Sequence, residues 1–204
     1  MKSLLKAPLV FHPANPVHPA HSAAAAAVER IDVEVFVGAD GRVGLLFSVR
    51  APMGCLRVPA PSASVFTDGL WRHTCGELFV ARAGEAGYRE YNFSPSGEWA
   101  TYSFDDYRTP QAAGEVDAVC SAVAPEISVK QGDAGFFMCV DLPPGTIELD
   151  PPALDAPLQL AVTMVLEASD GHLSYWALTH PCAQPDFHHR DGFRQIDTQR
   201  DRGA

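Results

Sequence analysis

IDVEVFVGADGRVGLLFSV, residues 31–49, is the segment that indicates the fold class most strongly. Apolar side chains recur at every second position on both sides of Asp40-Gly41, which is the pattern of two half-buried β-strands joined by a tight turn. Because alternate residues of a strand face opposite sides of a sheet, this pattern turns one apolar face toward a core. We therefore expect a β-hairpin here.

Apolar segments of strand length occur throughout the rest of the chain. They lie at 77–82, 88–93, 98–104, 126–130, 136–142, 158–167, 173–178 and, more briefly, 193–196. Turn residues such as Ser94-Pro95-Ser96-Gly97 and Asp170-Gly171 separate them. About ten strands at this spacing predict an all-β fold, an antiparallel two-sheet β-sandwich of jelly-roll or immunoglobulin-like type. We expect less than about a tenth of the residues in α-helix. Residues 51–70 and 108–125 are predicted to be irregular.

The size and composition of the chain fit a single domain. A sandwich of 204 residues commonly forms one unit, and 17 prolines with 16 glycines suit many short strands joined by turns. We expect the domain to cover residues 1–197, followed by a polar C-terminal tail at 198–204.

The charge balance argues against two classes of partner. The formal net charge is −10, and the acidic residues are scattered rather than clustered. Such a surface repels phosphate groups, and no basic stripe compensates. We therefore expect no nucleic acid and no anionic membrane surface as a partner.

The cysteines and the N-terminal residues favour a cytoplasmic protein. Pro8 and Pro13 interrupt the apolar stretch that follows Lys2 and Lys6, so a continuous signal-peptide core of about 7–15 apolar residues is not expected. The cysteines include no C-x-x-C pair, and we expect all of them to be reduced thiols. They are Cys55, Cys75, Cys120, Cys139 and Cys182.

The known motifs of metal binding and catalysis are not present in the sequence. His188 and His189 are adjacent, so an extended backbone would point them to opposite sides. The sequence contains no H-E-x-x-H helix motif, no G-x-S-x-G elbow and no phosphate-binding P-loop. We therefore expect no metal, no cofactor and no enzymatic activity.

Three polar or aromatic residues stand out as candidate ligand contacts. Trp71 follows Asp68-Gly69-Leu70 at the exit of a loop, where its indole offers a flat apolar face or caps the core. Glu77 opens a strand, where its carboxylate accepts ligand hydroxyls or pairs with an arginine such as Arg72 or Arg89. Asn92 offers a donor and an acceptor, for a ligand or for loop backbone.

Three segments carry a family resemblance: LWRHTCGELFV (70–80), YREYNFSPSGEWATYSFDDYR (88–108) and SYWALTHPCAQPDFHHRDGF (174–193). Together they resemble the bacterial DOMON-like domain proteins, which are similar to the family 9 carbohydrate-binding modules. The resemblance implies a β-sandwich with a ligand site at one edge. In the sugar-binding relatives, two aromatic side chains enclose a sugar ring while acidic and amide groups bind its hydroxyls.

The positions that resemble this arrangement are Trp71, Glu77 and Trp176, and Trp99 is expected to belong to the core. The chain departs from the relatives at Gly76, where they usually carry a larger apolar residue. It is also not expected to carry the export signal that polysaccharide-binding modules need. Some DOMON relatives hold a b-type haem, for which a methionine and His180 would be the ligands. The methionines are Met53, Met138 and Met164.

The hypothesis that best fits these observations is non-catalytic binding of a small, carbohydrate-like ligand by Trp71, Glu77, Asn92 and Trp176. One alternative is an intracellular protein-interaction or structural sandwich without a small ligand. The other is a b-type haem-binding redox module.

Overall fold

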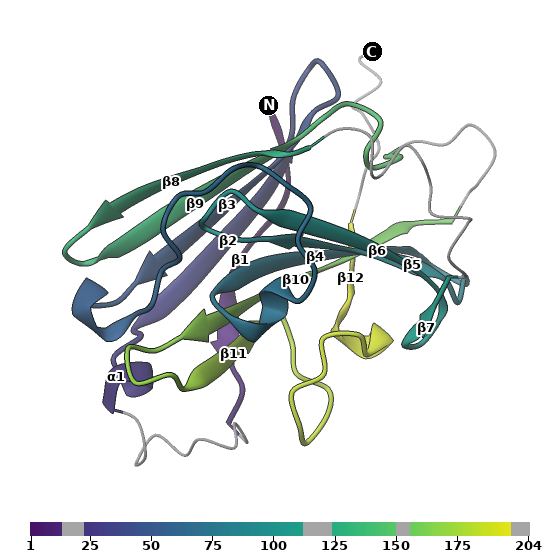
Figure 1. Cartoon of the computed structure of the whole chain (residues 1–204). Coiled ribbons are helices and arrows are strands. Elements are labelled where there is room, and N and C mark those ends of the chain that lie inside the picture. Colours follow the sequence, from purple (N-terminus) through teal and green to yellow (C-terminus); the bar gives the residue numbers. More distant parts are fainter. Residues whose placement is uncertain (14–22, 112–123, 150–155, 197–204) are drawn as a thin grey trace.

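The computed structural model of the protein describes residues 1–13, 23–111, 124–149 and 156–196. Its strands form one continuous 12-stranded sheet that folds over into two layers (Figure 1). All pairs of neighbouring strands are antiparallel, so the predicted fold class is confirmed. In the described ranges the α-helix is limited to α1 (Ala23–Ala26). No helix of these ranges is long and apolar enough to cross a membrane.

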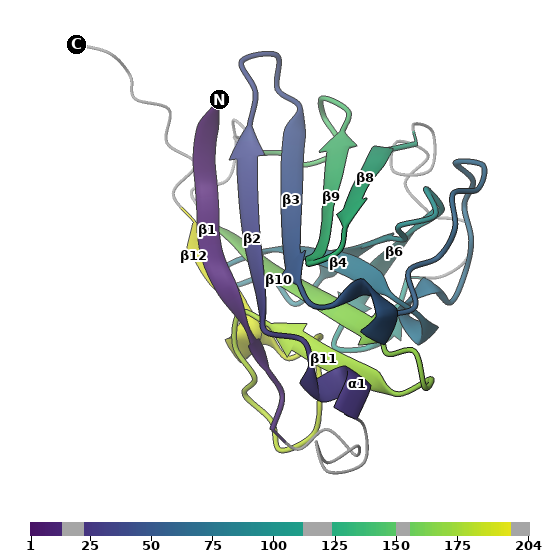
Figure 2. The ribbon, with the colours of Figure 1, turned by 90° about the vertical axis from the view of Figure 1, so that its left-hand side faces the viewer.

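The first layer contains five strands, which Figure 2 shows side by side. In spatial order they are β1 (Lys2–Phe11), β2 (Arg30–Val37), β3 (Val43–Arg50), β9 (Gly135–Leu142) and β8 (Glu126–Gly132). Strands β10 and β4 of the second layer cross behind them in the same view. The hairpin expected at 31–49 is the β2–β3 pair, and Gly41 in its turn has a φ of 83°.

The second layer continues from the end of β1. In spatial order its strands are β11 (Leu173–Ala177), β10 (Leu158–Glu167), β4 (Cys75–Arg82), β5 (Tyr88–Phe93), β6 (Trp99–Asp106) and β7 (Thr109–Pro110), while β12 (Arg194–Ile196) pairs with β10. The three consecutive strands expected at 77–104 are β4, β5 and β6. Residues 51–70 contain the 3₁₀ turn η1 (Met53–Cys55) and the first residue of η2 (Leu70–Arg72), and none of the named strands. A third 3₁₀ turn is η3 (Arg190–Gly192).

Strand β1 joins the two layers, and its sequence does not predict it. It pairs with β2 over most of its length and with β11 through Val10 and Phe11 at its end. Pro8 interrupts the apolar pattern but lies opposite Asp32, where only β2 pairs with the strand. Proline is tolerated at such an edge because its missing N–H leaves no partner unsatisfied.

The main core lies between the layers. Ile31, Leu45 and Phe47 of the first layer pack in the same buried cluster as Leu78 and Met164 of the second. The alternation recognised in the sequence therefore points each strand's apolar face to the other layer.

Gly76 shows how closely the layers approach. A Cβ atom at this position would lie 2.7 Å from Met138 Cε and 2.9 Å from Phe47 Cζ, both on the first layer. Glycine therefore occurs here, in place of a larger apolar residue, because the first layer fills the space.

Two expectations fall partly outside the described residues. The polar tail at 198–204 lies outside them, as does Cys120. The other four cysteines, Cys55, Cys75, Cys139 and Cys182, are free.

Candidate functional site

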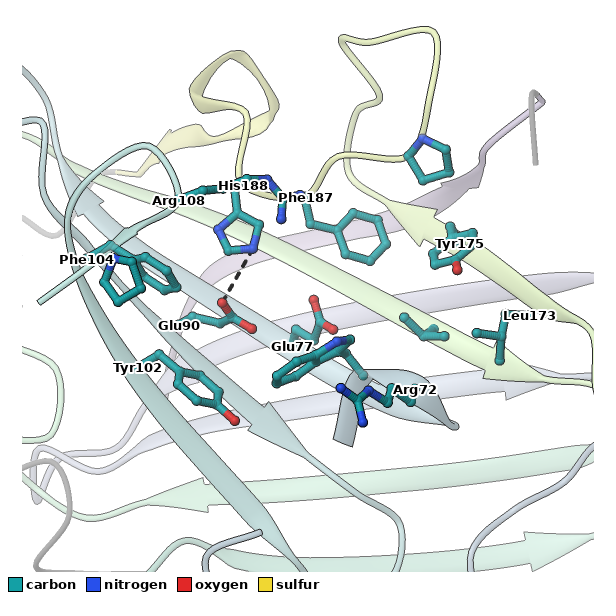
Figure 3. Close-up of a pocket in the computed structure, with 14 residues that line it drawn as sticks. Arg72, Glu77, Glu90, Tyr102, Phe104, Arg108, Leu173, Tyr175, Phe187 and His188 are labelled. Carbon is teal, nitrogen blue, oxygen red and sulfur yellow. Dashed lines mark ion pairs between the residues drawn. The ribbon is translucent and has the colours of Figure 1, made fainter. Parts of the chain in front are cut away.

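A cavity of about 590 Å³ lies on the outer face of the second layer, which is turned away from the first layer. Strand alternation identifies this face, since Glu77, Glu90 and Tyr175 line the cavity while their neighbours Leu78, Tyr91 and Trp176 belong to the core between the layers. Its lining residues come from β4, β5, β6, β10, β11, η2, the segment 108–110 and the loop 185–188 (Figure 3).

Two glutamates form the floor of the cavity. Glu77 lies on β4 and Glu90 on the neighbouring strand β5, and the two residues are only 2% and 5% exposed. Figure 3 shows both carboxyl groups pointing into the cavity. Buried carboxyl groups are rare because transfer from water disfavours the charged form, so their presence in pairs identifies a specialised site.

One oxygen of each carboxyl group is held by the protein. Thr163 Oγ1 donates a hydrogen bond to Glu77 Oε2 at 2.9 Å, and Asn92 Nδ2 donates to Glu90 Oε1 at 2.7 Å. The other two oxygens, Glu77 Oε1 and Glu90 Oε2, accept no hydrogen bond from the described residues. Each carboxyl group is therefore oriented from one side and open to a ligand on the other.

Aromatic side chains flank this floor on two sides. On one side Trp71 of η2 contacts Tyr102 of β6 edge to face, with ring centroids 5.6 Å apart. On the other side Tyr175 of β11 contacts Phe187 at 6.0 Å. Figure 3 shows Tyr102 on one side of the carboxyl groups and Tyr175 and Phe187 on the other. The cavity thus combines a polar floor with apolar walls, the composition typical of small-molecule sites.

A hydrogen-bonded network positions two residues that line the cavity, Arg108 and His188. Tyr88 OH and His188 Nδ1 are 2.7 Å apart, and the backbone N–H of Arg108 donates to the same hydroxyl oxygen at 3.1 Å. The Arg108 guanidinium donates to Asp186 Oδ1 at 2.8 Å, and the backbone N–H of His188 donates to that oxygen at 3.1 Å. These bonds fix the position of His188, whose Nε2 lies 3.6 Å from Glu90 Oε2.

Burial changes the protonation of the three titratable groups at the centre. Desolvation and the nearby charge of Glu90 raise the pKa of Glu77 well above 4.5, and desolvation raises the pKa of Glu90 to about 7. Desolvation and the charge of Arg108 lower the pKa of His188 to about 4. At neutral pH the imidazole is therefore uncharged, and the two carboxyl groups together retain a proton.

The structure brings two of the four candidate residues into the cavity. Trp71, 37% exposed, and Glu77 line it directly. Glu77 contacts Thr163 rather than Arg72 or Arg89, so the alternative of an arginine pair does not occur. Asn92 is fully buried beside Glu90 on the same face of β5, where it donates to Glu90 and accepts a weak hydrogen bond from Cys75 Sγ. Its role at the site is to orient Glu90.

Trp176 requires a correction. Its indole is 7% exposed, points between the layers and contacts Phe11 with ring centroids 5.3 Å apart, while Nε1 donates to Ser174 Oγ. The reason is strand alternation: Tyr175, one residue earlier on β11, takes the outward position. We therefore exclude Trp176 from the candidate site.

The residues considered for other roles lie elsewhere. Trp99 is buried, as expected, with its ring against Phe66. Met138 and Met164, considered as haem ligands, are fully buried between the layers, and His180 contacts the Val10 carbonyl. Neither methionine nor His180 lines the cavity.

Some cavity residues could have been found from the sequence and others could not. Glu90 and Asn92 share a strand face two residues apart, and the same rule selects Tyr102 and Tyr175 once the inward residues are known. Phe187 and His188 lie in an irregular loop, where alternation predicts nothing.

Comparisons with known proteins identify the fold. No family model and no curated protein matches the chain. A presumed carbohydrate-binding protein from Bacteroides uniformis superimposes with a TM-score of 0.59 at 12% identity, over 94% of this chain and 85% of that one. A family 9 carbohydrate-binding module from Caldicellulosiruptor kristjanssonii in complex with glucose gives a TM-score of 0.45 at 10% identity, over 72% of this chain and 65% of that one. The likeness to the Bacteroides uniformis protein shows that this chain has the same fold.

Proposed function

We propose that the protein is a non-catalytic binding domain whose cavity takes a small carbohydrate-like ligand. The observation that carries the proposal is the pair of inward-pointing carboxyl groups between two aromatic walls. Sugar rings present apolar C–H faces and a rim of hydroxyl groups, which match aromatic faces and carboxyl oxygens respectively.

The size of the cavity agrees with this class of ligand. At a share of about 30 Å³ per water molecule in the liquid, 590 Å³ holds roughly 20 water-sized groups, enough for one or two sugar rings. The fold neighbour from Bacteroides uniformis, described as carbohydrate-binding, supports the same proposal. On the three sequence segments that resemble DOMON-like proteins, we also propose that the protein belongs to that family. On the cysteines, which include no C-x-x-C pair, we propose a cytoplasmic location.

We propose binding without catalysis because the two glutamates of the floor are not set apart from each other by a basic partner. Glycoside hydrolysis requires one carboxyl group to stay ionised while the other holds a proton. Here burial raises the pKa values of Glu77 and Glu90 together, and neither forms an ion pair with Lys or Arg of the described ranges. No Lys or Arg of the described ranges pairs with either group to fix which of the two is ionised, so we propose recognition alone.

Replacement of Trp71 by alanine is expected to weaken sugar binding about fivefold. Loss of one aromatic wall removes a stacking interaction that contributes about 1 kcal/mol, which corresponds to about fivefold in affinity. The measurement is isothermal calorimetry with the mono- or disaccharide that gives the largest thermal shift in a panel of neutral and amino sugars.

The matched control is Phe66→Ala, an exposed aromatic residue that contacts Trp99 and Tyr102 but does not line the cavity. It should leave the affinity unchanged. If no sugar of the panel raises the melting temperature or gives a calorimetric signal, the proposal is overturned.

A further inference from the structure

The floor of the cavity holds more negative charge than its surroundings compensate. Glu77 Oε1 and Glu90 Oε2 are both open to the cavity, and neither carboxyl group forms an ion pair with Lys or Arg in the described part of the chain. A neutral sugar brings no positive charge to such a floor. Two buried carboxyl groups side by side are a costly arrangement unless a cation joins them.

The cationic side chains that line the cavity form their contacts with residues other than Glu77 and Glu90. Arg108 donates to Asp186, which compensates its charge, although it still lowers the pKa of both glutamates slightly. Arg72 is exposed, with its guanidinium 6.0 Å from the centre of the Trp71 ring. His188 is uncharged because its pKa is lowered to about 4. The remaining titratable groups that interact with the pair are Cys75, Tyr88, Tyr102 and Tyr175, which are neutral because burial raises their pKa values.

The walls also suit a cation. Trp71, Tyr102, Tyr175 and Phe187 present aromatic rings around the same space. Aromatic faces attract ammonium groups by about 0.5–2 kcal/mol, and the attraction is largest where water is excluded. An aromatic enclosure over paired carboxyl groups therefore favours a positively charged group over a hydroxyl group.

We propose that the preferred ligand is an amino sugar, whose protonated amine contacts Glu77 Oε1 and Glu90 Oε2. This inference rests on the proposed function and narrows it. The ammonium group takes over the neutralising role of the proton that the two carboxyl groups share in the empty cavity. Binding therefore releases up to one proton from the glutamates, and the amine keeps its own protons.

The test is calorimetry at pH 6.5 with matched pairs of sugars: glucosamine with glucose, galactosamine with galactose, and mannosamine with mannose. We expect the amino sugar of at least one pair to bind about tenfold to a hundredfold more tightly, since hydrogen bonds between charged partners are the stronger kind. Titration in phosphate and in ACES, which both buffer near pH 6.5 but differ in ionisation enthalpy, should show proton release for the amino sugar alone.

Two variants test whether the glutamates of the floor cause the preference for the amino sugar. Glu90→Gln keeps the hydrogen bond from Asn92 but removes one charge, and it should abolish most of the preference within the pair. Glu34→Gln removes a carboxylate on β2 that pairs with Lys6 and is absent from the cavity lining, and it should leave the preference intact. A melting curve of each variant establishes that it is folded.

The outcomes separate this inference from the proposed function. Equal binding of both members of every pair would overturn the inference and leave sugar binding in place. Absence of binding by any sugar would overturn both. Ethanolamine binding as tightly as glucosamine would support amine recognition and overturn the carbohydrate proposal, because the sugar ring would then contribute nothing.

Discussion

Replacement of Trp176 by alanine is expected to lower the free energy of unfolding by about 3–5 kcal/mol, the usual cost of truncating a buried tryptophan. The indole is 7% exposed, and its contact with Phe11 lies where β1 joins the two layers. Truncation leaves a void there and removes the indole N–H that donates to Ser174 Oγ. Equilibrium unfolding in urea at neutral pH measures the loss.

Trp71→Ala is the matched comparison, because it removes the same side chain from a position that is 37% exposed. Surface substitutions usually change stability by no more than about 0.5 kcal/mol. We therefore expect Trp71→Ala to affect ligand binding and Trp176→Ala to affect stability. If the two variants lose similar free energies of unfolding, the assignment of Trp71 to the cavity wall and of Trp176 to the core is wrong.

The second large effect concerns the pH dependence of stability. Burial raises the pKa of Glu90 from 4.5 to about 7, so between these pH values the folded protein binds a proton that the unfolded chain has released. Stability contributed by this group is therefore lost as pH rises through that window. At about 1.4 kcal/mol for each pKa unit, the loss amounts to roughly 3 kcal/mol.

His188 opposes this trend and must be separated from it. Its pKa is lowered to about 4, so the unfolded chain binds the extra proton between pH 4 and 6.5, and stability rises with pH there. The wild-type profile alone therefore mixes two slopes of opposite sign. The difference between Glu90→Gln and wild type removes most of the His188 contribution, because desolvation and Arg108 lower the pKa of His188. It includes the fall in the pKa of Glu77 when the charge of Glu90 is removed.

We expect Glu90→Gln to gain about 3 kcal/mol relative to wild type as the pH rises from 4.5 to 7, in urea unfolding followed at several pH values. Gln retains an acceptor for Asn92 Nδ2, so the hydrogen bond to the floor is kept. Glu34→Gln on the first layer is the charge control and should not reproduce the slope. A flat difference for Glu90→Gln would mean that Glu90 is ionised in the folded protein throughout this range.

Most of the fold could be predicted because alternation is a local property of the sequence. The pairs of strands on either side of Asp40-Gly41 and Asp170-Gly171 are read directly from the spacing of their apolar residues. Strand β1 could not be predicted, because Pro8 is acceptable only at an edge whose existence depends on the complete sheet. Local patterns carry no information on which side of a strand stays unpaired.

The site could be predicted only in part for a related reason. Glu77 is recognisable as a polar residue on a buried strand, but alternation alone does not say which of Tyr175 and Trp176 faces outward, since both are aromatic. On β10 both faces are buried, so the apolar pattern there does not distinguish the core from the cavity. The loop that carries Phe187 and His188 is positioned by contacts from distant strands, such as Tyr88 to His188.

The most direct test of the central claim is a crystal structure of the protein with the sugar that binds most tightly. We predict ligand density over Glu77 and Glu90, between Tyr102 on one side and Tyr175 with Phe187 on the other. Trp71, whose ring contacts Tyr102, should contact the ligand from the same side as Tyr102. Density for the sugar at a different surface, with the cavity on the outer face of the second layer filled only by water, would contradict the account.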